Sequence, residues 1–210
     1  DSNTAKVGVI PRNASTALRS LQGKRAQKIL KKNSAYLARL DKEKWRVVVQ
    51  DESIFVYDVK IRKIWVGTGS KPVVLATGSH RRTVAYGALA DDGPQLFRLK
   101  ANGDENYFLE YLKELHRKYF FMVLFLDRAT YHKKSELVKA YLRLHRKTIR
   151  VRWFPPGFPE SNPLEECWRQ GKGSDLLSVF PESFDQFKKS ISEYYRTTRF
   201  KLNSYNYLCH

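Results

Sequence analysis

The chain has 210 residues, of which 42% are hydrophobic and 29% are charged. This length suits one domain with an appended segment, and the apolar content is enough for a hydrophobic core, so general disorder is excluded. Lys and Arg number 39 against 21 Asp and Glu, a formal net charge of +18. Such an excess indicates a polyanionic partner, with nucleic acid ahead of an anionic membrane surface, while positive charge that only confers solubility is the competing interpretation.

The chain shows no signal peptide and no apolar run long enough to span a bilayer, which predicts a soluble, intracellular protein. Its two cysteines, Cys167 and Cys209, do not have the spacing of a zinc site. Neither a disulfide framework nor a zinc centre is therefore expected. Any bound metal would have oxygen ligands.

Residues 1–44 are predicted to form a basic helical arm, followed by one domain over residues 45–210. Half of the excess positive charge lies in the first 50 residues. From residue 15 to 44, leucines and isoleucines are spaced among basic residues as in a helix, with a break expected at Gly23. The basic face of this arm either contacts DNA or is an ordinary solvated surface.

The domain begins with β-rich runs and ends with helical ones. Strands are predicted over residues 46–50, 53–59, 62–66, 83–89, 95–99, 121–126 and 149–154. Helices are predicted over residues 106–119, 133–146, 162–170 and 182–195. Antiparallel hairpins followed by strand–helix alternation are typical of an α/β fold with a mixed sheet flanked by helices.

Two aspartates follow apolar strand-like runs, where a mixed sheet presents its ligand-facing edge. Asp51 ends an apolar run and shares a strand face with Val49, whereas Glu52 points to the opposite face because strand side chains alternate. We therefore interpret Glu52 as a support residue. Asp127 directly follows six apolar residues.

The third candidate, Glu165, lies where a Pro-rich loop leads into a helix. Asn162 suits the helix N-cap and Pro163 the first helical position. The spacing is close to a capping box, so Glu165 bonding back to the Asn162 backbone, or pairing with Arg169, is the competing interpretation. Glu160 is an alternative third ligand.

The three acidic candidates together indicate a metal site more strongly than any one of them alone. Three converging carboxylates repel one another and raise each other's pKa unless divalent cations bind between them. Oxygen-only ligation suits Mg²⁺ or Mn²⁺, and two such ions about 4 Å apart activate an attacking oxygen and stabilise a leaving one. On a basic protein, this pattern favours phosphodiester chemistry.

Five blocks of sequence, in order, carry a family resemblance. The chain resembles the DDE transposases, specifically the prokaryotic insertion-sequence branch of the mariner superfamily. The blocks are residues 50–53, 64–72, 86–89, 126–133 and 155–168. The resemblance implies a ribonuclease H-like α/β fold with a mixed five-stranded sheet, three antiparallel strands coming before the parallel ones. It also implies that Asp51, Asp127 and Glu165 form a metal-binding catalytic triad.

The implied reaction is metal-dependent DNA cleavage at transposon ends and strand transfer into target DNA. The resemblance further implies insertion at TA dinucleotides, a homodimeric synaptic complex and a prokaryotic cytoplasm, with the protein associated with the nucleoid. Relatives are longer and begin with helix-turn-helix modules, so this chain is similar to their catalytic domain with a linker arm. The alternatives are a ribonuclease H-like endonuclease or resolvase that cuts without joining, and an inactive DNA-binding remnant.

Basic residues near the strand ends are the expected phosphate contacts. Arg128 occupies a position where the family usually has Asn. His132, in a position where relatives also carry histidine, either contacts substrate, supports the metal site or is an ordinary helix-start histidine. Trp65, Trp153 and Trp168 are expected to be packing residues. The predicted DNA-binding residues are Lys71, Arg81, Arg82, Arg128, His132, Lys133 and Lys134.

Overall fold

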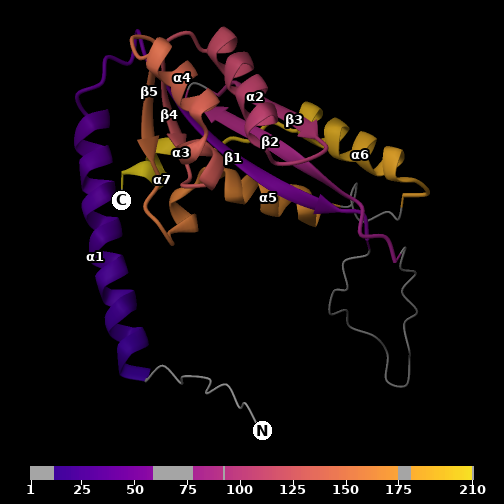
Figure 1. Ribbon diagram of the computed structural model, residues 1–210, viewed down its shortest axis with the longest axis horizontal. Helices are drawn as coiled ribbons and strands as arrows, with labels where there is room; N and C mark the ends of the chain where they lie inside the picture. The colour runs from indigo at the N-terminus through magenta and orange to yellow at the C-terminus, as the bar shows by residue number, and fades with distance from the viewer. Residues whose placement is uncertain (1–11, 59–77, 92, 175–180, 210) are drawn as a thin grey trace, which may run out of the picture.

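The computed structural model describes residues 12–58, 78–91, 93–174 and 181–209. A five-stranded sheet with the strand order β3-β2-β1-β4-β5 forms its centre (Figure 1). Strands β1, β2 and β3 pair antiparallel, and β1, β4 and β5 pair parallel. The mixed five-stranded sheet confirms the predicted fold class. The strands are β1 (Arg46–Val56), β2 (Arg82–Ala90), β3 (Gln95–Lys100), β4 (Met122–Leu126) and β5 (Ile149–Trp153).

The pairing of β1 with β4 positions two acidic residues. In this parallel ladder Val49 lies opposite Phe125. Continuing the same register by two residues brings Asp51 beside Asp127. Residues far apart in sequence therefore become neighbours where β4 ends beside the middle of β1, so the prediction that Asp51 ends its strand was wrong.

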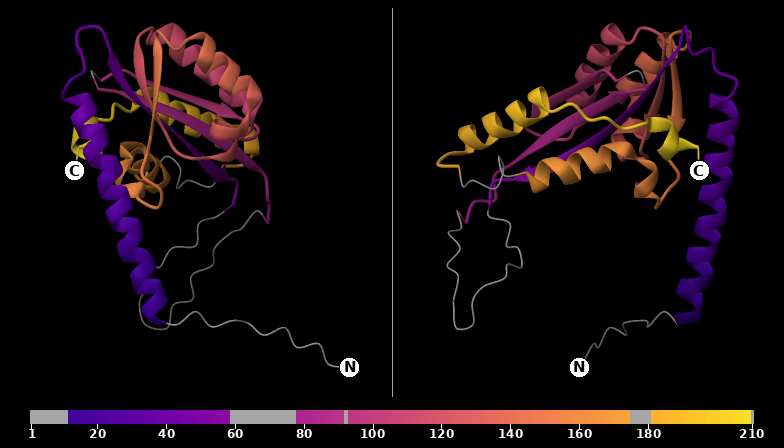
Figure 2. Two further views of the ribbon diagram at one scale, coloured as in Figure 1. Left: turned by 60° about the vertical axis from the view of Figure 1, so that its left-hand side comes forward. Right: turned by 180° about the vertical axis from the view of Figure 1, so that it is seen from behind.

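Helices cover both faces of the sheet (Figures 1 and 2). Val47 and Val49 on β1 face the core shared with α5 and α6, and Val48 faces the core shared with α2 and α4. This alternation is the two-residue period expected of a strand buried on both sides. The covering helices are α2 (Glu105–Lys118), α4 (Glu136–Leu144), α5 (Pro163–Gly173) and α6 (Phe184–Thr197).

Several predicted boundaries were wrong. The strands predicted over 46–50 and 53–59 are one continuous strand, β1, which pairs with β2 without a break. The single helix predicted over 133–146 is two helices, α3 (Thr130–Lys134) and α4, because the hydroxyl of Ser135 accepts the N–H of Val138 and caps a new helix. The predicted strand 62–66, Trp65 and Lys71 lie outside the described residues.

Two short helical segments were not predicted at all. One is a 3-10 turn, η1 (Pro159–Ser161), and the other is α7 (Ser204–Leu208). Both have fewer residues than hydrophobic periodicity needs to become visible in a sequence.

Helix α1 (Arg12–Leu37) stands beside β5 and α7 and reaches past the sheet (Figure 2). It runs through Gly23, so the predicted break was wrong; one glycine costs a helix only about 1 kcal/mol. Ala26, Leu30 and Leu37 are buried along one side of it. No helix of the described residues is long and apolar enough to cross a membrane. The boundary between an arm and a domain at residues 44 and 45 stays a prediction.

Gly87 on β2 offers a test of the packing behind Asp51, its register partner on β1. A Cβ at this position would lie 2.6 Å from the Trp168 ring and 2.7 Å from the Phe97 ring. We expect Gly87→Ala to lower the free energy of unfolding by about 1–3 kcal/mol, as overpacking does, measured by urea denaturation. Gly23→Ala, which meets nothing within 4 Å, is the control and should be neutral or stabilising. Equal stability of the two variants would contradict this packing.

Candidate metal centre

Asp51 is held between the sheet and α5. Its side chain is buried on the β1 face that α5 covers, with 8% of the residue exposed. The indole Nε1–H of Trp168, on α5, donates to Asp51 Oδ2 at 3.0 Å. Trp168 also packs edge-on against Phe55 of the same strand. The predicted packing role of Trp168 is therefore confirmed, and the ring in addition orients a carboxylate.

The environment of Asp51 opposes its ionisation. Burial, followed by the negative charges of Glu52, Glu165 and Asp127, raises the pKa of Asp51 to about 7, against the opposing hydrogen bond from Trp168. Each of these three carboxylates therefore lies close enough to act on Asp51 electrostatically. The convergence of Asp51, Asp127 and Glu165 on a bound ion stays a prediction.

Glu165 lies in the first turn of α5 and is exposed. The predicted cap of this helix is confirmed: Asn162 Oδ1 accepts the N–H of Leu164 at 3.1 Å, and Pro163 takes the first helical position. The cap fixes where the helix begins and hence the position of Glu165. Glu160, the alternative ligand, is exposed in η1 and does not contribute to the raised pKa of Asp51.

The competing interpretations of Glu165 do not hold among the described residues. The backbone N–H of Asn162 donates to the carbonyl of Pro159 at 2.9 Å, so no capping box forms. Arg169 pairs instead with Glu166, at 2.5 Å. The Glu165 carboxylate is therefore left to solvent or to a ligand.

Asp127 directly follows β4, and its side chain is 46% exposed. Its Oδ1 accepts the N–H of Ala129 at 3.0 Å and lies 2.7 Å from Nδ1 of His132. Burial alone would raise the pKa of Asp127, but the contacts with His132 and Ala129 outweigh it and hold the pKa below its ordinary value. Asp127 is thus ionised under conditions in which Asp51 is still partly protonated.

His132, on α3, is buried between two carboxylates. Its Nε2 lies 3.2 Å from Glu52 Oε1, and its side chain has no exposed area. Burial alone would lower the pKa of His132, but the contacts with Asp127 and Glu52 raise it to about 9. A side chain without exposed area has no face to offer DNA, so the position fits support of the metal site. No sequence signal links Glu52 with His132, because they meet only through the fold.

Glu52, Asp127 and His132 offer ligand atoms within 4.8 Å of one another, a spacing that a metal ion could use. The imidazole, however, faces Glu52 with Nε2 and Asp127 with Nδ1. One ion cannot replace contacts on opposite sides of the ring at once. We therefore interpret these three residues as an ionic bridge and place the candidate cation site beside it, at Asp51.

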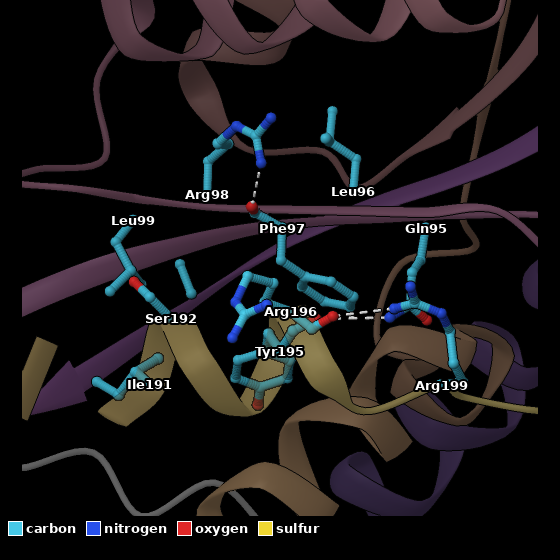
Figure 3. Close-up of a pocket in the computed structure, with 11 residues that line it drawn as sticks. Gln95, Leu96, Phe97, Arg98, Leu99, Ile191, Ser192, Tyr195, Arg196 and Arg199 are labelled. Atoms are coloured by element: carbon cyan, nitrogen blue, oxygen red, sulfur yellow. Dashed lines mark hydrogen bonds between the residues drawn. The ribbon is translucent and has the colours of Figure 1, made fainter. Parts of the chain in front are cut away.

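Asp51, Glu52 and Asp127 border a cleft of about 420 Å³, and Glu165 is not among the residues that line it. A second pocket, of about 350 Å³, lies between β3 and α6 (Figure 3). There the Phe97 ring stacks on the Tyr195 ring, with 4.7 Å between the ring centres, and the Gln95 amide donates to the Tyr195 carbonyl. No predicted ligand lines that second pocket. The cleft is lined by Asp51, Glu52, Ile54, Arg82, Val84, Asn102, Gly103 and Asp127.

The donor set fits the predicted metal. Asp51, Asp127 and Glu165 supply oxygen atoms only, which Mg²⁺ and Mn²⁺ prefer. Burial is the largest cause of the raised pKa of Asp51, and repulsion from neighbouring carboxylates adds to it; a divalent cation would favour the charged form. The ligand assignment itself stays a prediction.

The predicted DNA-binding residues surround this cleft unevenly. Arg82 lines it, and Arg128 is exposed beside Asp127 while its Nε donates to the Phe154 carbonyl at 3.4 Å. Lys133 lies over the Trp153 ring, 5.2 Å from its centre. Arg81 and Lys134 are exposed.

Comparison with known proteins gives one family and one fold. The family described as DDE superfamily endonuclease matches residues 46–188. The Mos1 mariner paired-end complex with Mn has a TM-score of 0.66 and 15% identity, covering 99% of this chain and 63% of that one. The Mos1 transposase paired-end complex with left transposon end has a TM-score of 0.64 and 15% identity, and the match covers 99% of this chain and 62% of that one. The Mos1 strand transfer complex has a TM-score of 0.62 and 17% identity, and the match covers 97% of this chain and 61% of that one.

This chain therefore spans less than two thirds of the length of the Mos1 chains it matches. A search of curated proteins gave no match.

The buried Asp51 predicts a pH dependence of stability. Asp51 ionises near pH 3.8 when unfolded and near pH 7 when folded, so the unfolded state releases the proton first and stability falls as pH rises between these values. At about 1.4 kcal/mol per pKa unit, the loss amounts to about 3–4 kcal/mol. Urea denaturation at pH 4.5 and pH 7 with EDTA present should show this loss in the wild type and not in Asp51→Asn. Equal losses in both proteins would contradict the buried, repelled carboxylate.

Proposed function

Because the chain belongs to the DDE superfamily endonucleases, we propose that it is the catalytic part of a transposase. It cleaves DNA at the ends of a mobile element and joins the freed end to target DNA. The observation that carries the proposal is Asp51, a carboxylate buried on the central strand, held by the Trp168 indole and placed beside Asp127 by the register of β1 and β4. The fold shared with the Mos1 transposase complexes, one of them a strand transfer complex, supports it.

Asp51, Asp127 and Glu165 would hold Mg²⁺ or Mn²⁺, two ions in total. Solved Mos1 complexes with Mn and with Mg support this choice of metal. When bound, such ions supply activation of the attacking oxygen and stabilisation of the leaving oxygen in displacement at phosphorus.

The residues of this chain play different parts. Asp51 would hold a cation in its ionised form, because a nearby cation favours the charged form of a carboxylate, and Trp168 keeps that carboxylate in place. Asp127 is ionised beforehand. Glu165 is exposed at the start of α5, where it can meet DNA, and Arg82 and Arg128 lie at or near the cleft to bind phosphate.

Helix α1 supplies a surface for the DNA backbone. Lys24, Lys28 and Lys31 recur at helical spacing on its exposed side, away from the buried Leu30 and Leu37. Residues 2–40 contain no acidic side chain, and none of these three lysines forms an ion pair with a described residue. Successive lysines rise about 4.5–6 Å along the helix, so the three charges form one row on its exposed side.

Two arginines of the edge strand β5 extend this basic surface. Arg150 lies over the Trp45 ring at 3.9 Å, and Arg152 lies over the Tyr36 ring at 3.6 Å. Stacking on a ring fixes a guanidinium in place, and Arg150 in addition donates Nη1 to the Tyr36 hydroxyl at 3.2 Å. The surface formed by α1 and β5 is therefore preorganised at its domain end.

The printed family description, an endonuclease, also fits an enzyme that cuts without joining. A strand-transfer assay with a pre-cleaved transposon end separates the two functions: joined product supports the transposase, and cleavage without joining supports the nuclease. For an inactive DNA-binding remnant, titration would show no uptake of Mg²⁺ or Mn²⁺. A homodimeric synaptic complex, TA target sites and a place with the nucleoid in a prokaryotic cytoplasm belong to the same proposal.

Neutralising the three proposed ligands tests the reaction. Asp51→Asn, Asp127→Asn and Glu165→Gln should each abolish Mg²⁺-dependent nicking of supercoiled DNA, because each removes a charge that the cation needs. Binding of DNA, measured by fluorescence anisotropy, should persist. Glu166→Gln is the matched control, since Glu166 neighbours Glu165 but pairs with Arg169. Undiminished nicking by the three variants would rule out the mechanism.

Removing the lysines of α1 tests the DNA surface. The triple variant Lys24→Gln, Lys28→Gln and Lys31→Gln should reduce the slope of log affinity against log salt by about 3, close to 0.9 per lost phosphate contact. A control triple variant of exposed residues on α2 and α6, Lys113→Gln, Arg117→Gln and Lys189→Gln, should leave most of the slope intact. Equal slopes for the two variants would show that α1 contributes only general charge.

A further inference from the structure

A chain of polar contacts links the central strand to the loop after β4. His132 contacts Glu52 Oε1 with Nε2 at 3.2 Å and Asp127 Oδ1 with Nδ1 at 2.7 Å. Gln50 donates its Nε2 to the same Glu52 oxygen at 2.8 Å. The contacts thus run from Gln50 and Glu52 on β1, through His132, to Asp127, which directly follows the last residue of β4.

Asp127 depends on this bridge because the sheet no longer holds it. The residue follows the last residue of β4, and its side chain is nearly half exposed. Both of its side-chain contacts, from Ala129 and His132, go to Oδ1. Oδ2 makes no hydrogen bond to any residue of the described chain. One oxygen is therefore anchored, and the other is left for a ligand.

The imidazole is itself held firmly. Its ring lies 4.2 Å, centre to centre, from the ring of Phe108 on α2, and it is completely buried. Helix α3, which carries His132, packs against α2 and α4. A ring fixed on all sides passes its orientation on to the carboxylates that it touches.

The ring contacts the two carboxylates with different nitrogens. Nδ1 lies 2.7 Å from Asp127 Oδ1, and Nε2 lies 3.2 Å from Glu52 Oε1. Because an imidazole ring is rigid, holding one nitrogen against Glu52 fixes the direction from which the other meets Asp127.

We propose that His132 is a positioning residue that ties Asp127 to Glu52, fixing the Asp127 carboxylate with one oxygen free for a divalent cation. This inference rests on the proposed function, because it assigns Asp127 as a metal ligand. His132 itself does not bind the cation, and Glu52 acts through His132.

The test measures Mn²⁺ affinity of the whole chain by titration calorimetry. His132→Gln should weaken Mn²⁺ binding about 10–100-fold, the usual effect of losing a group that orients a metal ligand. Glu52→Ala breaks the bridge from its other end and should act in the same direction. The double variant should lose no more than His132→Gln alone, since both changes break one connection. Circular dichroism checks folding, and if one single variant does not fold, the other carries the test.

His116→Gln is the matched control. His116 is also buried, and both of its ring nitrogens have partners, Tyr141 at 2.8 Å and Thr148 at 2.9 Å, but it lies away from the carboxylates. Its replacement should lower the melting temperature and leave Mn²⁺ affinity unchanged. If His132→Gln also lowers the melting temperature and leaves Mn²⁺ affinity unchanged, His132 has only a stabilising role and the proposal is overturned.

Electron spin-echo spectroscopy of the Mn²⁺-loaded protein separates positioning from ligation. We expect the spectrum of the wild type to show no coupling of Mn²⁺ to a directly bound imidazole nitrogen. Such a coupling in the wild type that disappears in His132→Gln would overturn the proposal. A wild type that binds no Mn²⁺ would also overturn it. DNA nicking is measured separately. A wild type that binds Mn²⁺ and does not nick DNA, with the affinity losses as predicted, refutes the transposase and supports the positioning role.

Discussion

Burial of a carboxylate among other carboxylates is the constraint on which this site depends. Asp51 lies on the central strand with one hydrogen bond from Trp168, and its pKa of about 7 shows how strongly the surroundings resist its charge. Such a cost persists in proteins mainly where a ligand offsets it, and a divalent cation does so directly. The aromatic packing of α5 on the sheet leaves room only for glycine at position 87, and Trp168 within that packing donates to Asp51.

The fold treats its two neighbouring aspartates differently. Asp51 has a buried, uncompensated environment, whereas Asp127 is ionised through His132 and the N–H of Ala129. These neighbouring carboxylates have opposite pKa shifts, so Asp127 is the more readily ionised of the two and would offer a cation its charge at lower pH. This asymmetry follows from which face of the sheet each partner comes from.

Local signals predicted most of the elements. The helix that carries Glu165 was correct because Asn162 and Pro163 are chemically suited to its start, and the buried strands were correct because their apolar runs are short and bounded. Errors arose where two elements join. Nothing local distinguishes a strand that continues through Asp51 and Glu52 from one that ends there, since pairing with β2 decides it.

The sequence by itself determined the fold class, the basic character of α1 and the acidic candidates, because these depend on residue types and on periodicity along the chain. Only the tertiary structure decided that Glu165 is free of Arg169, that Trp168 binds Asp51 and that His132 joins Glu52 to Asp127. Such contacts connect residues on different strands and helices. They are set by strand register and helix packing, which no single stretch of sequence encodes.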